Sequence, residues 1–230
     1  MKKLLPRLIK TAIVLMIAII GSYKTLDINA QKYDDSPVAI EIINTPAGQV
    51  LGTLEIKGRA PKTGYTRDMF GSGWQRIDDC DMRNYILARD MTDLSFVTPS
   101  CKVASGILHD PYSDKTIVFS RGLDTSDDVQ IDHVVALSDA WQKGAQQLTS
   151  LQRETLANDP LELLAVDGSL NQQKADGDAA TWLPPNKDFR CSYVARQIAV
   201  KKKYSLWVTR SEYDAMAIIL AACPEQTLPN

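Results

Sequence analysis

The side chains best suited to do chemistry lie in IDHVVALSDAW, residues 131–141, where Asp132 directly precedes His133. The chain has only two histidines, and this one stands in a strongly apolar stretch. Burying a carboxylate beside an imidazole is costly unless hydrogen bonds or another charge offset the lost hydration. The pair is therefore either a fully hydrogen-bonded structural feature or a reactive one.

A second polar pair follows in DGSLNQQKADGD, residues 167–178. This stretch predicts a turn followed by a short helix that begins near Asn171. On such a helix Asn171 and Lys174, three positions apart, share one face. A site assembled from these residues needs elements that bring two distant segments together.

The pattern between the two pairs predicts those elements. VQIDHVV, residues 129–135, and LELLAV, residues 161–166, are apolar runs typical of strands. The segment between them, residues 138–158, predicts a helical region with Ser138 as its N-cap. Neighbouring strand residues point to opposite faces, so we expect the first strand to end or bend at Asp132 and His133.

The remaining segments predict a mixture of loops, strands and helices. GRAPKTGYTRDMFGSGW, residues 58–74, is rich in glycine and aromatic residues and predicts an irregular loop. CDMRNYILARDM predicts a short helix and TIVFS a strand. The chain closes with two predicted helices, the last opened by Ser211 and Asp214 as a capping box.

These ordered motifs resemble a known nuclease family. The IDH and NxxK pattern is similar to that of HNH, or His-Me finger (ββα-metal), nucleases. The closer resemblance is to secreted proteins sharing the nuclease domain at the C-terminal end of GmrSD-type restriction enzymes. It covers about residues 50–223 and implies an α+β fold, with a ββα-metal nuclease core embedded in a mostly helical, disulfide-stapled domain. The motifs that carry it are GRAPKTGYTRDMFGSGW, CDMRN, CKVASGILHDPY, VQIDHVVALSDAWQKGA, LANDPLELLAVDGSLNQQKADGDAATWLPPN and RCSYVARQIAVKKKYSL.

Hydrolysis of a phosphodiester requires a base for water, a cation at the phosphate and positive groups that hold the polyanion. His133 has the pKa range of a general base. Asp132 and Asn171 offer the oxygen ligands that suit Mg²⁺, or another divalent ion such as Mn²⁺. The resemblance assigns these residues those roles and implies that Lys174 faces the phosphate.

One position departs from the family pattern. The second strand of the family carries an asparagine where this chain has Glu162. Glutamate keeps a backbone carbonyl that can orient the histidine but lacks amide donors. We therefore expect Asn158 to take over part of the bracing and include it in the catalytic set.

The formal charge of −2 gives no general affinity for polyanions, so substrate must be held by a local patch. Residues 171–210 include eight basic side chains and three acidic ones. Such a patch predicts salt-sensitive binding of DNA, with RNA as a second candidate, and little base reading. The predicted contacts are Arg196, Lys201 and Lys203, together with Arg67 and Arg83 from the matched motifs.

The four cysteines are widely spaced and form no CxxC pair, which disfavours a zinc site. In an oxidising compartment they predict two disulfides. The simplest pairing joins Cys80 to Cys101 and Cys191 to Cys223, although four cysteines allow three pairings.

The N-terminus predicts export. The basic segment MKKLLPRLIK precedes the apolar run TAIVLMIAIIG, so residues 1–22 are interpreted as a signal peptide or an N-terminal membrane anchor. Residues 23–49 predict a polar linker, and residues 50–230 the nuclease domain. We expect a secreted or membrane-anchored extracytoplasmic protein that touches membrane only through this segment and needs no obligate protein partner.

Two functions remain open at this point. The first is an extracellular, metal-dependent endonuclease of low sequence specificity. The second is a non-catalytic, surface-attached nucleic-acid-binding protein on the same scaffold. A zinc peptidase is disfavoured because the chain has two histidines and no HExxH motif.

Overall fold

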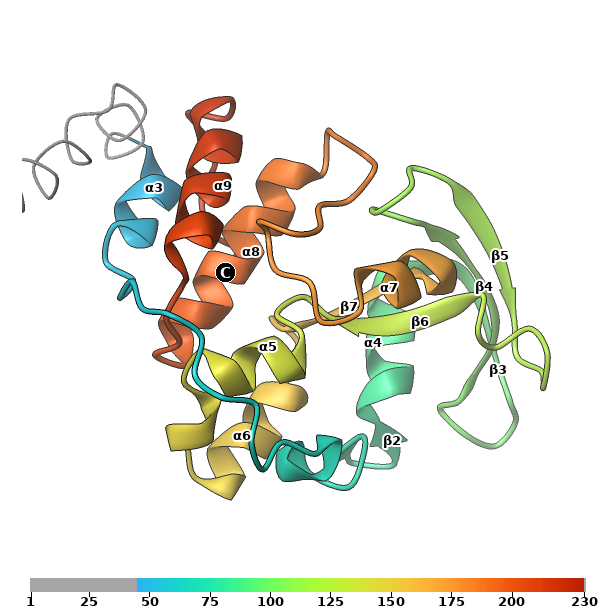
Figure 1. Cartoon of the computed structure of the whole chain (residues 1–230). Helices are drawn as coiled ribbons and strands as arrows, with labels where there is room; N and C mark the ends of the chain where they lie inside the picture. Colours follow the sequence, from blue (N-terminus) through green and yellow to red (C-terminus); the bar gives the residue numbers. More distant parts are fainter. Residues whose placement is uncertain (1–44, 230) are drawn as a thin grey trace, which may run out of the picture. The chain divides into compact units, whose positions relative to one another are not determined.

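The computed structural model describes residues 45–229 (Figure 1). The predicted signal or anchor at residues 1–22, and residues 23–44 of the predicted linker, lie outside the described residues. The described chain is a mixed α+β structure, as predicted. Its elements, in chain order, are α3 (Pro46–Leu51), η1 (Arg67–Phe70), β1 (Arg76–Ile77), β2 (Cys80–Asp81), α4 (Met82–Asp90), β3 (Met91–Phe96), β4 (Val103–His109), β5 (Thr116–Ser120), β6 (Val129–His133), α5 (Leu137–Gln142), η2 (Ala145–Gln147), α6 (Ser150–Ala157), β7 (Leu163–Asp167), α7 (Gly168–Lys174), α8 (Arg190–Lys203) and α9 (Arg210–Ala221).

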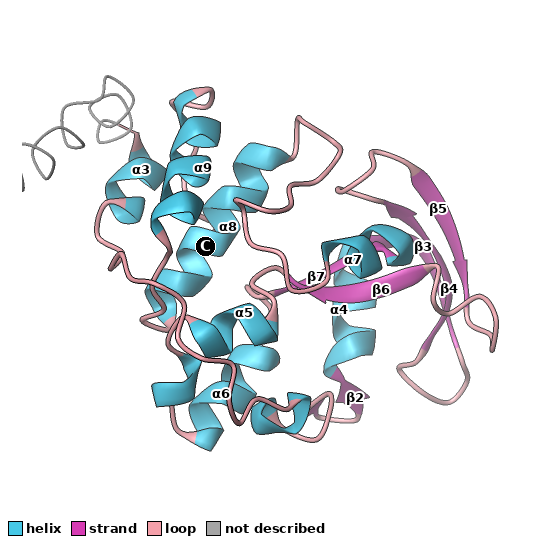
Figure 2. Ribbon diagram, in the orientation of Figure 1, coloured by secondary structure: helices cyan, strands magenta, loops and turns pink. Residues whose placement is uncertain are grey.

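The strands form small antiparallel sheets in the order β1-β2, β3-β4-β5 and β6-β7. Figure 2 shows helices α3, α5, α6, α8 and α9 on one side of the described chain and the strands, with α4 and α7, on the other. The predicted helix over CDMRNYILARDM and the predicted strand TIVFS are confirmed as α4 and β5.

The β6–β7 ribbon lies between two hydrophobic cores. Its register pairs Asp132 with Leu164 and His133 with Leu163. Leu163 and Ala165 belong to the core beneath α4 and the three-stranded sheet, whereas Leu164 belongs to the helical core. Because both faces are covered, β7 reads as an unbroken apolar run rather than an alternating one.

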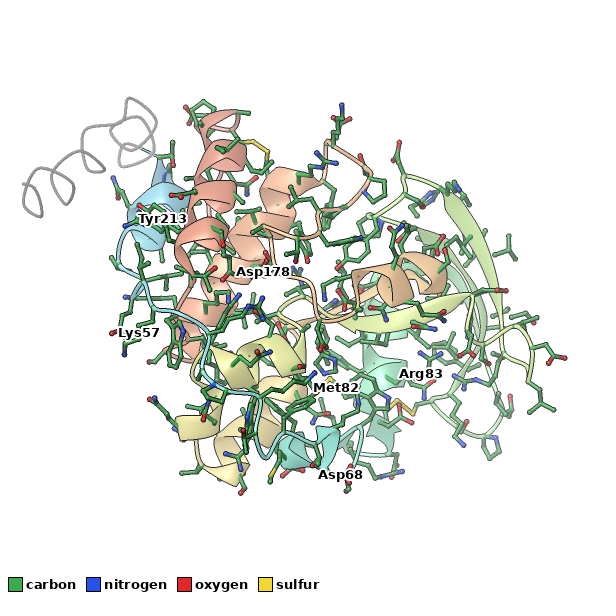
Figure 3. All side chains as sticks on the ribbon, viewed as in Figure 1. Lys57, Asp68, Met82, Arg83, Asp178 and Tyr213 are labelled. Carbon is green, nitrogen blue, oxygen red and sulfur yellow. A yellow bond between two sulfur atoms is a disulfide. The ribbon has the colours of Figure 1, made fainter. Side chains whose placement is uncertain are left out.

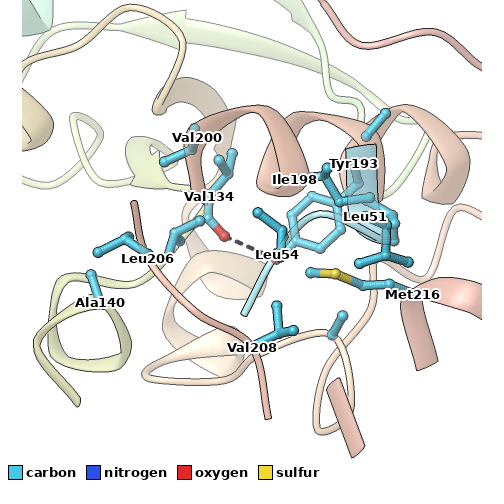
Figure 4. Close-up of a cluster of buried hydrophobic side chains, with 14 of the residues drawn as sticks. Leu51, Leu54, Val134, Ala140, Tyr193, Ile198, Val200, Leu206, Val208 and Met216 are labelled. Carbon is cyan, nitrogen blue, oxygen red and sulfur yellow. Dashed lines mark hydrogen bonds between the residues drawn. The ribbon is translucent and has the colours of Figure 1, made fainter. Parts of the chain in front are cut away.

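The helical core is built mainly by α5, α8 and α9 with α3 (Figure 4). Ile198 and Leu220 are fully buried in it, and truncating either to alanine would cost about 2–5 kcal/mol. Helix α3 adds Ala47 and Leu51 to the same core. The packed chain therefore includes residues before position 50, where the domain is predicted to begin.

Helix α7 is set directly against the loop before β6. Asp167 caps it, because its Oδ1 accepts from the N–H groups of Ser169 and Leu170 at 2.8 and 3.1 Å. A Cβ on Gly168 would lie 1.9 Å from the carbonyl oxygen of Asp127, so only glycine allows this approach. The helix starts before the predicted position near Asn171.

Two predicted helix caps are wrong. Helix α5 begins at Leu137, so Ser138 lies inside its first turn and is not its N-cap. The predicted helical region is also divided into α5, η2 and α6. At α9 the capping box is formed by Thr209 and Glu212, two residues before the predicted pair. Thr209 with Glu212 and Ser211 with Asp214 have the same spacing, so the sequence pattern did not tell them apart. In the structure the buried Glu212 is the residue that closes the box.

Both predicted disulfides are confirmed. Cys80–Cys101 joins β2 to the turn between β3 and β4, and Cys191–Cys223 joins the first turn of α8 to the end of α9. By loop closure each would stabilise the fold by about 3–4 kcal/mol.

A balanced set of buried charges, which we call the buried ion network, ties the helical side together. Lys143 Nζ lies 2.6–2.8 Å from carboxylate oxygens of Asp139, Asp178 and Glu212. Lys201 Nζ lies 3.0 Å from Glu212, and Arg59 pairs with Asp139 and Asp178 from the rim. The network therefore joins the chain before η1, helices α5, α8 and α9, and the loop after α7, where Figure 3 labels Asp178. Lys201 is fully buried, so its prediction as a nucleic-acid contact is wrong.

Candidate functional site

The end of β6 presents two polar side chains to opposite sides of the ribbon. The strand stops at His133, as predicted. Strand alternation places Asp132 on the face covered by α7 and His133 on the face toward α6. Both nevertheless line one cavity of about 250 Å³, because the strand ends there. We call it the polar cavity.

Asp132 is held from two sides. Tyr112 Oη donates to its Oδ2 at 2.5 Å, and Lys174 Nζ donates to its Oδ1 at 2.9 Å. Burial, followed by the charge of Asp132, raises the pKa of Tyr112 well above its usual value, so the phenol remains a donor. Lys174 also donates to the carbonyl of His133 at 2.7 Å and is 2% exposed. The lysine thus positions the Asp132–His133 pair from inside and does not face solvent.

His133 has one ring nitrogen engaged. Its Nε2 lies 3.0 Å from the carbonyl oxygen of Ala157, and only a protonated Nε2 can bond a carbonyl. The neutral ring therefore carries its lone pair on Nδ1, for which the described chain provides no hydrogen-bond partner. Burial, with the charges of Arg67 and Lys174, lowers the pKa of His133 to about 3, against the opposing bond to Ala157. The ring is therefore neutral at pH 7, and the lowered pKa makes it a weaker base than an ordinary imidazole.

The end of α6 fixes the histidine in two ways. Ala157 accepts its Nε2 proton, while the next residue, Asn158, accepts the backbone N–H of Gln75 through Oδ1 at 2.8 Å. Gln75 follows Trp74, whose ring stacks on His133 with centroids 5.7 Å apart and planes 5° apart. Asn158 makes no bond to His133 itself. It braces the loop that holds Trp74 against the imidazole.

Glu162 holds the turn after His133. Its carbonyl accepts from Val134 N at 2.9 Å, and its Oε2 accepts from Val135 N at 3.2 Å. The side chain is fully buried, and this burial raises its pKa well above the usual value. The Glu162 carbonyl thus fixes Val134, while the carbonyl that orients the His133 ring is that of Ala157.

Asn171 faces the polar cavity from α7. Its Nδ2 donates to Gln130 Oε1 at 3.0 Å, which leaves its Oδ1 as a free acceptor toward the cavity that Asp132 also lines. Mg²⁺ is usually held by one or two carboxylates, with waters and phosphate oxygens completing its shell. One carboxylate and one amide oxygen fit that mode. The described residues contain no group of three or more His, Cys, Asp or Glu that could form an all-protein cage.

The loop of residues 67–74 forms the outer wall. Arg67 is exposed, lines the polar cavity, and has no ion pair within the described chain. A second cavity of about 220 Å³, which we call the side cavity, shares Arg67, His133 and Leu137 with the first. Tyr65, Ser138 and Asp176 also line the polar cavity, and none of them was among the predicted site residues. The aromatic and glycine content of residues 58–74 was the only signal for this wall.

The other predicted substrate contacts lie elsewhere. Arg83 donates to the carbonyls of Ser126 and Val129, and Arg196 donates to those of Leu161 and Leu163. Both brace backbone beside the β6–β7 ribbon. Lys203 is half exposed and pairs with Asp159 at 2.6 Å. Of the predicted basic contacts, Arg67 is the one that lines the cavities.

This chain matches one family model and is similar to a fungal protein. The family model for the C-terminal domain of GmrSD restriction endonucleases matches residues 81–219. An uncharacterized secreted protein of Arthroderma benhamiae (strain ATCC MYA-4681 / CBS 112371) is 36% identical over 179 residues, which cover 77% of this chain and 84% of that protein. No solved structure matches the chain. The family match includes β6 and α7 but begins after Arg67 and Trp74.

Proposed function

The chain belongs to the family of GmrSD restriction endonuclease C-terminal domains, and on that premise we propose that it is an extracellular, metal-dependent endonuclease of low sequence specificity, with DNA as its first substrate and RNA as its second. In this proposal β6, β7 and α7 are the ββα-metal core. The observation that carries it is the meeting of Asp132, His133, Asn171 and Arg67 on one polar cavity, although they come from segments far apart in the sequence.

Each of these side chains has a distinct task. His133 accepts the proton of the attacking water at Nδ1, a role worth about 10²- to 10⁴-fold in rate. Arg67 binds a non-bridging phosphate oxygen through its guanidinium. Mg²⁺ or Mn²⁺, held by Asp132 and Asn171, would neutralise charge on the phosphate and the leaving oxygen. Lys174 and Tyr112 act as positioning residues for Asp132.

Low sequence specificity follows from the kind of contact. Arg67, Asp132 and Asn171 address the phosphate or its counterion, and phosphate contacts carry no base information. Arg83, Arg196 and Lys201 are occupied inside the fold, so the remaining contact surface is small. Binding should weaken as salt rises, with a shallow slope.

The proposed compartment is extracytoplasmic. The similar fungal protein is named a secreted protein, and this chain carries two disulfides of the kind that persist in oxidising compartments. Among residues 45–229 no helix has the length and apolar character needed to span a bilayer. The same proposal takes residues 1–22 to be either a signal peptide or an N-terminal membrane anchor.

One observation favours the second function, a nucleic-acid-binding protein without catalysis. Both carboxylate oxygens of Asp132 are already bonded, to Tyr112 and Lys174, and Glu162 replaces the family asparagine. A carboxylate engaged in this way has fewer lone pairs for a cation.

A plasmid assay separates the two. The purified chain should nick supercoiled DNA with Mg²⁺ or Mn²⁺ and stop when EDTA is added. His133→Ala should lower cleavage by at least about 10²-fold without loss of fold or DNA binding. The other histidine provides the control, since His109 is exposed and bonds only Thr116; His109→Ala should cleave as the native chain does. DNA binding without cleavage under either metal would support the second function.

A further inference from the structure

The side cavity differs in character from the polar cavity beside it. Its walls are Phe70, Trp74, His133, Leu137 and Ala157, residues 71–73, and one charge of each sign, Arg67 and Asp68. The lining is therefore neutral and about half apolar. A phosphate or a cation would gain little there, whereas an uncharged aromatic group would match it.

The backbone of this wall is open to a ligand. Within the described chain no hydrogen bond is made by the N–H or C=O groups of Ser72, Gly73 or Trp74, and Ser72 and Gly73 are exposed, so a ligand would replace water at these groups. Gly73 has φ of +133°, and a Cβ added to it would meet no heavy atom within 4 Å. The wall thus offers bare donors and acceptors of the kind that pair with the edge of a base.

The wall is also fixed in advance. Arg153 Nε donates to the carbonyl of Met69 at 2.8 Å, and Asn158 accepts from Gln75 N at 2.8 Å. Both anchors belong to α6 or its C-terminal residue. The loop is held at each end, so a ligand would find the cavity already formed and would lose little free energy in ordering it.

We propose that the side cavity binds the nucleoside on one side of the scissile phosphate, with its base turned out of the stack. This rests on the proposed function. A phosphate in the polar cavity has one neighbouring nucleoside across Arg67 and His133, where the two cavities share their walls. A base held in a duplex does not turn into a cavity beside the phosphate without losing its pairing and stacking partners. The substrate class is therefore single-stranded or locally unpaired nucleic acid.

The test uses the full chain with Mg²⁺ and a labelled oligonucleotide, single-stranded or in a matched duplex. Single strands should be cleaved about tenfold faster, because a base already unstacked gives up nothing on entering the cavity. In a single strand carrying one abasic nucleotide, cleavage should fall about tenfold at the phosphate on one side of that nucleotide only. The position of the loss tells which nucleoside occupies the cavity.

A variant that fills the cavity provides the second arm. Ser72→Trp places an indole in the wall and should remove both the single-strand preference and the abasic effect. Leu123→Trp adds an indole at a fully exposed position outside both cavities and should behave as the native chain. Equal cleavage of single strands and duplex, with no loss beside the abasic nucleotide, overturns this inference and leaves the proposed nuclease intact. If no nucleic acid is cleaved, the proposed function fails and the inference fails with it.

Discussion

Two clusters of buried charged residues draw members from the same two chain segments but differ in how their charges are paired. The buried ion network sets three cations against three carboxylates, and every member has an opposite charge within ion-pair distance. The cluster at the end of β6 has one ion pair, Asp132 with Lys174, and its neighbours His133, Glu162 and Tyr112 form no ion pair within the described chain. It leaves the His133 Nδ1 and Asn171 Oδ1 without protein partners. The closed cluster supports the fold, and the incomplete one is available for chemistry.

The two clusters are also linked by short segments. Residues 132–139 supply Asp132 to one and Asp139 to the other, and residues 174–178 supply Lys174 and Asp178 in the same way. The network therefore anchors both segments that carry the candidate site. We therefore expect substitutions in the network to lower the free energy of unfolding, and substitutions in the candidate site to lower mainly the cleavage rate.

The largest stability loss is expected for Glu212→Gln. Glu212 Oε2 and Oε1 lie 2.6 and 3.0 Å from the ammonium groups of Lys143 and Lys201. Glutamine keeps the shape and the capping role but removes the charge, so the free energy of unfolding should fall by about 3–5 kcal/mol. Urea unfolding measures it, with Asp214→Asn on the same helix as control, since the Asp214 side chain is about half exposed. A loss below about 1 kcal/mol would contradict the closed-network picture.

The next effect is a pH dependence of the same network. Burial alone would raise the pKa of Asp178, but bonds and charges from Lys143 and Arg59 lower it to about 2. A carboxylate with a lowered folded pKa stabilises the protein above its unfolded pKa of about 4, and this stability is lost as the pH falls toward 2. The contribution is about 2 kcal/mol. Between pH 5 and 2, the free energy of unfolding should fall less steeply with pH in Asp178→Asn than in the native chain. An unchanged slope would mean that other groups cause the pH dependence.

A smaller effect is expected inside the candidate site. Tyr112→Phe removes the donor to Asp132 Oδ2 and should cost about 1.5 kcal/mol of stability. Because the carboxylate loses its orientation, kcat should fall about tenfold with little change in KM. Tyr85→Phe, on the exposed face of α4, is the matched control. If KM rises while kcat is kept, Tyr112 serves binding and not the positioning of Asp132.

The sequence predicted the ribbon and α7 because each has a local signal, whereas the cysteine count predicted two disulfides and left their pairing open. Apolar runs mark β6 and β7, and Asn171 and Lys174 share a face at any helix start nearby. The outer wall had a weaker signal: Arg67 was predicted from the matched motifs, but the stacking of Trp74 on His133 arises only through the tertiary fold. Lys201 was misjudged because a lysine run resembles a solvated helix end, and its burial depends on Glu212 on another helix.

The smallest change in stability is expected for Glu162→Gln, and it tests the difference between the two clusters most directly. Glu162→Gln alters a glutamate as buried as Glu212, but one whose pKa is raised by burial and that has no ion pair within the described chain. Between its unfolded pKa, near 4.5, and the higher folded value, the native state binds one more proton than the unfolded chain, so this glutamate makes stability fall as pH rises. Glutamine has no such proton. Urea unfolding should therefore give values within about 0.5 kcal/mol of the native chain at pH 5 and a more stable variant at pH 8. Destabilisation at both pH values would mean that Glu162 is ionised and paired, and the contrast between the two clusters would then be lost.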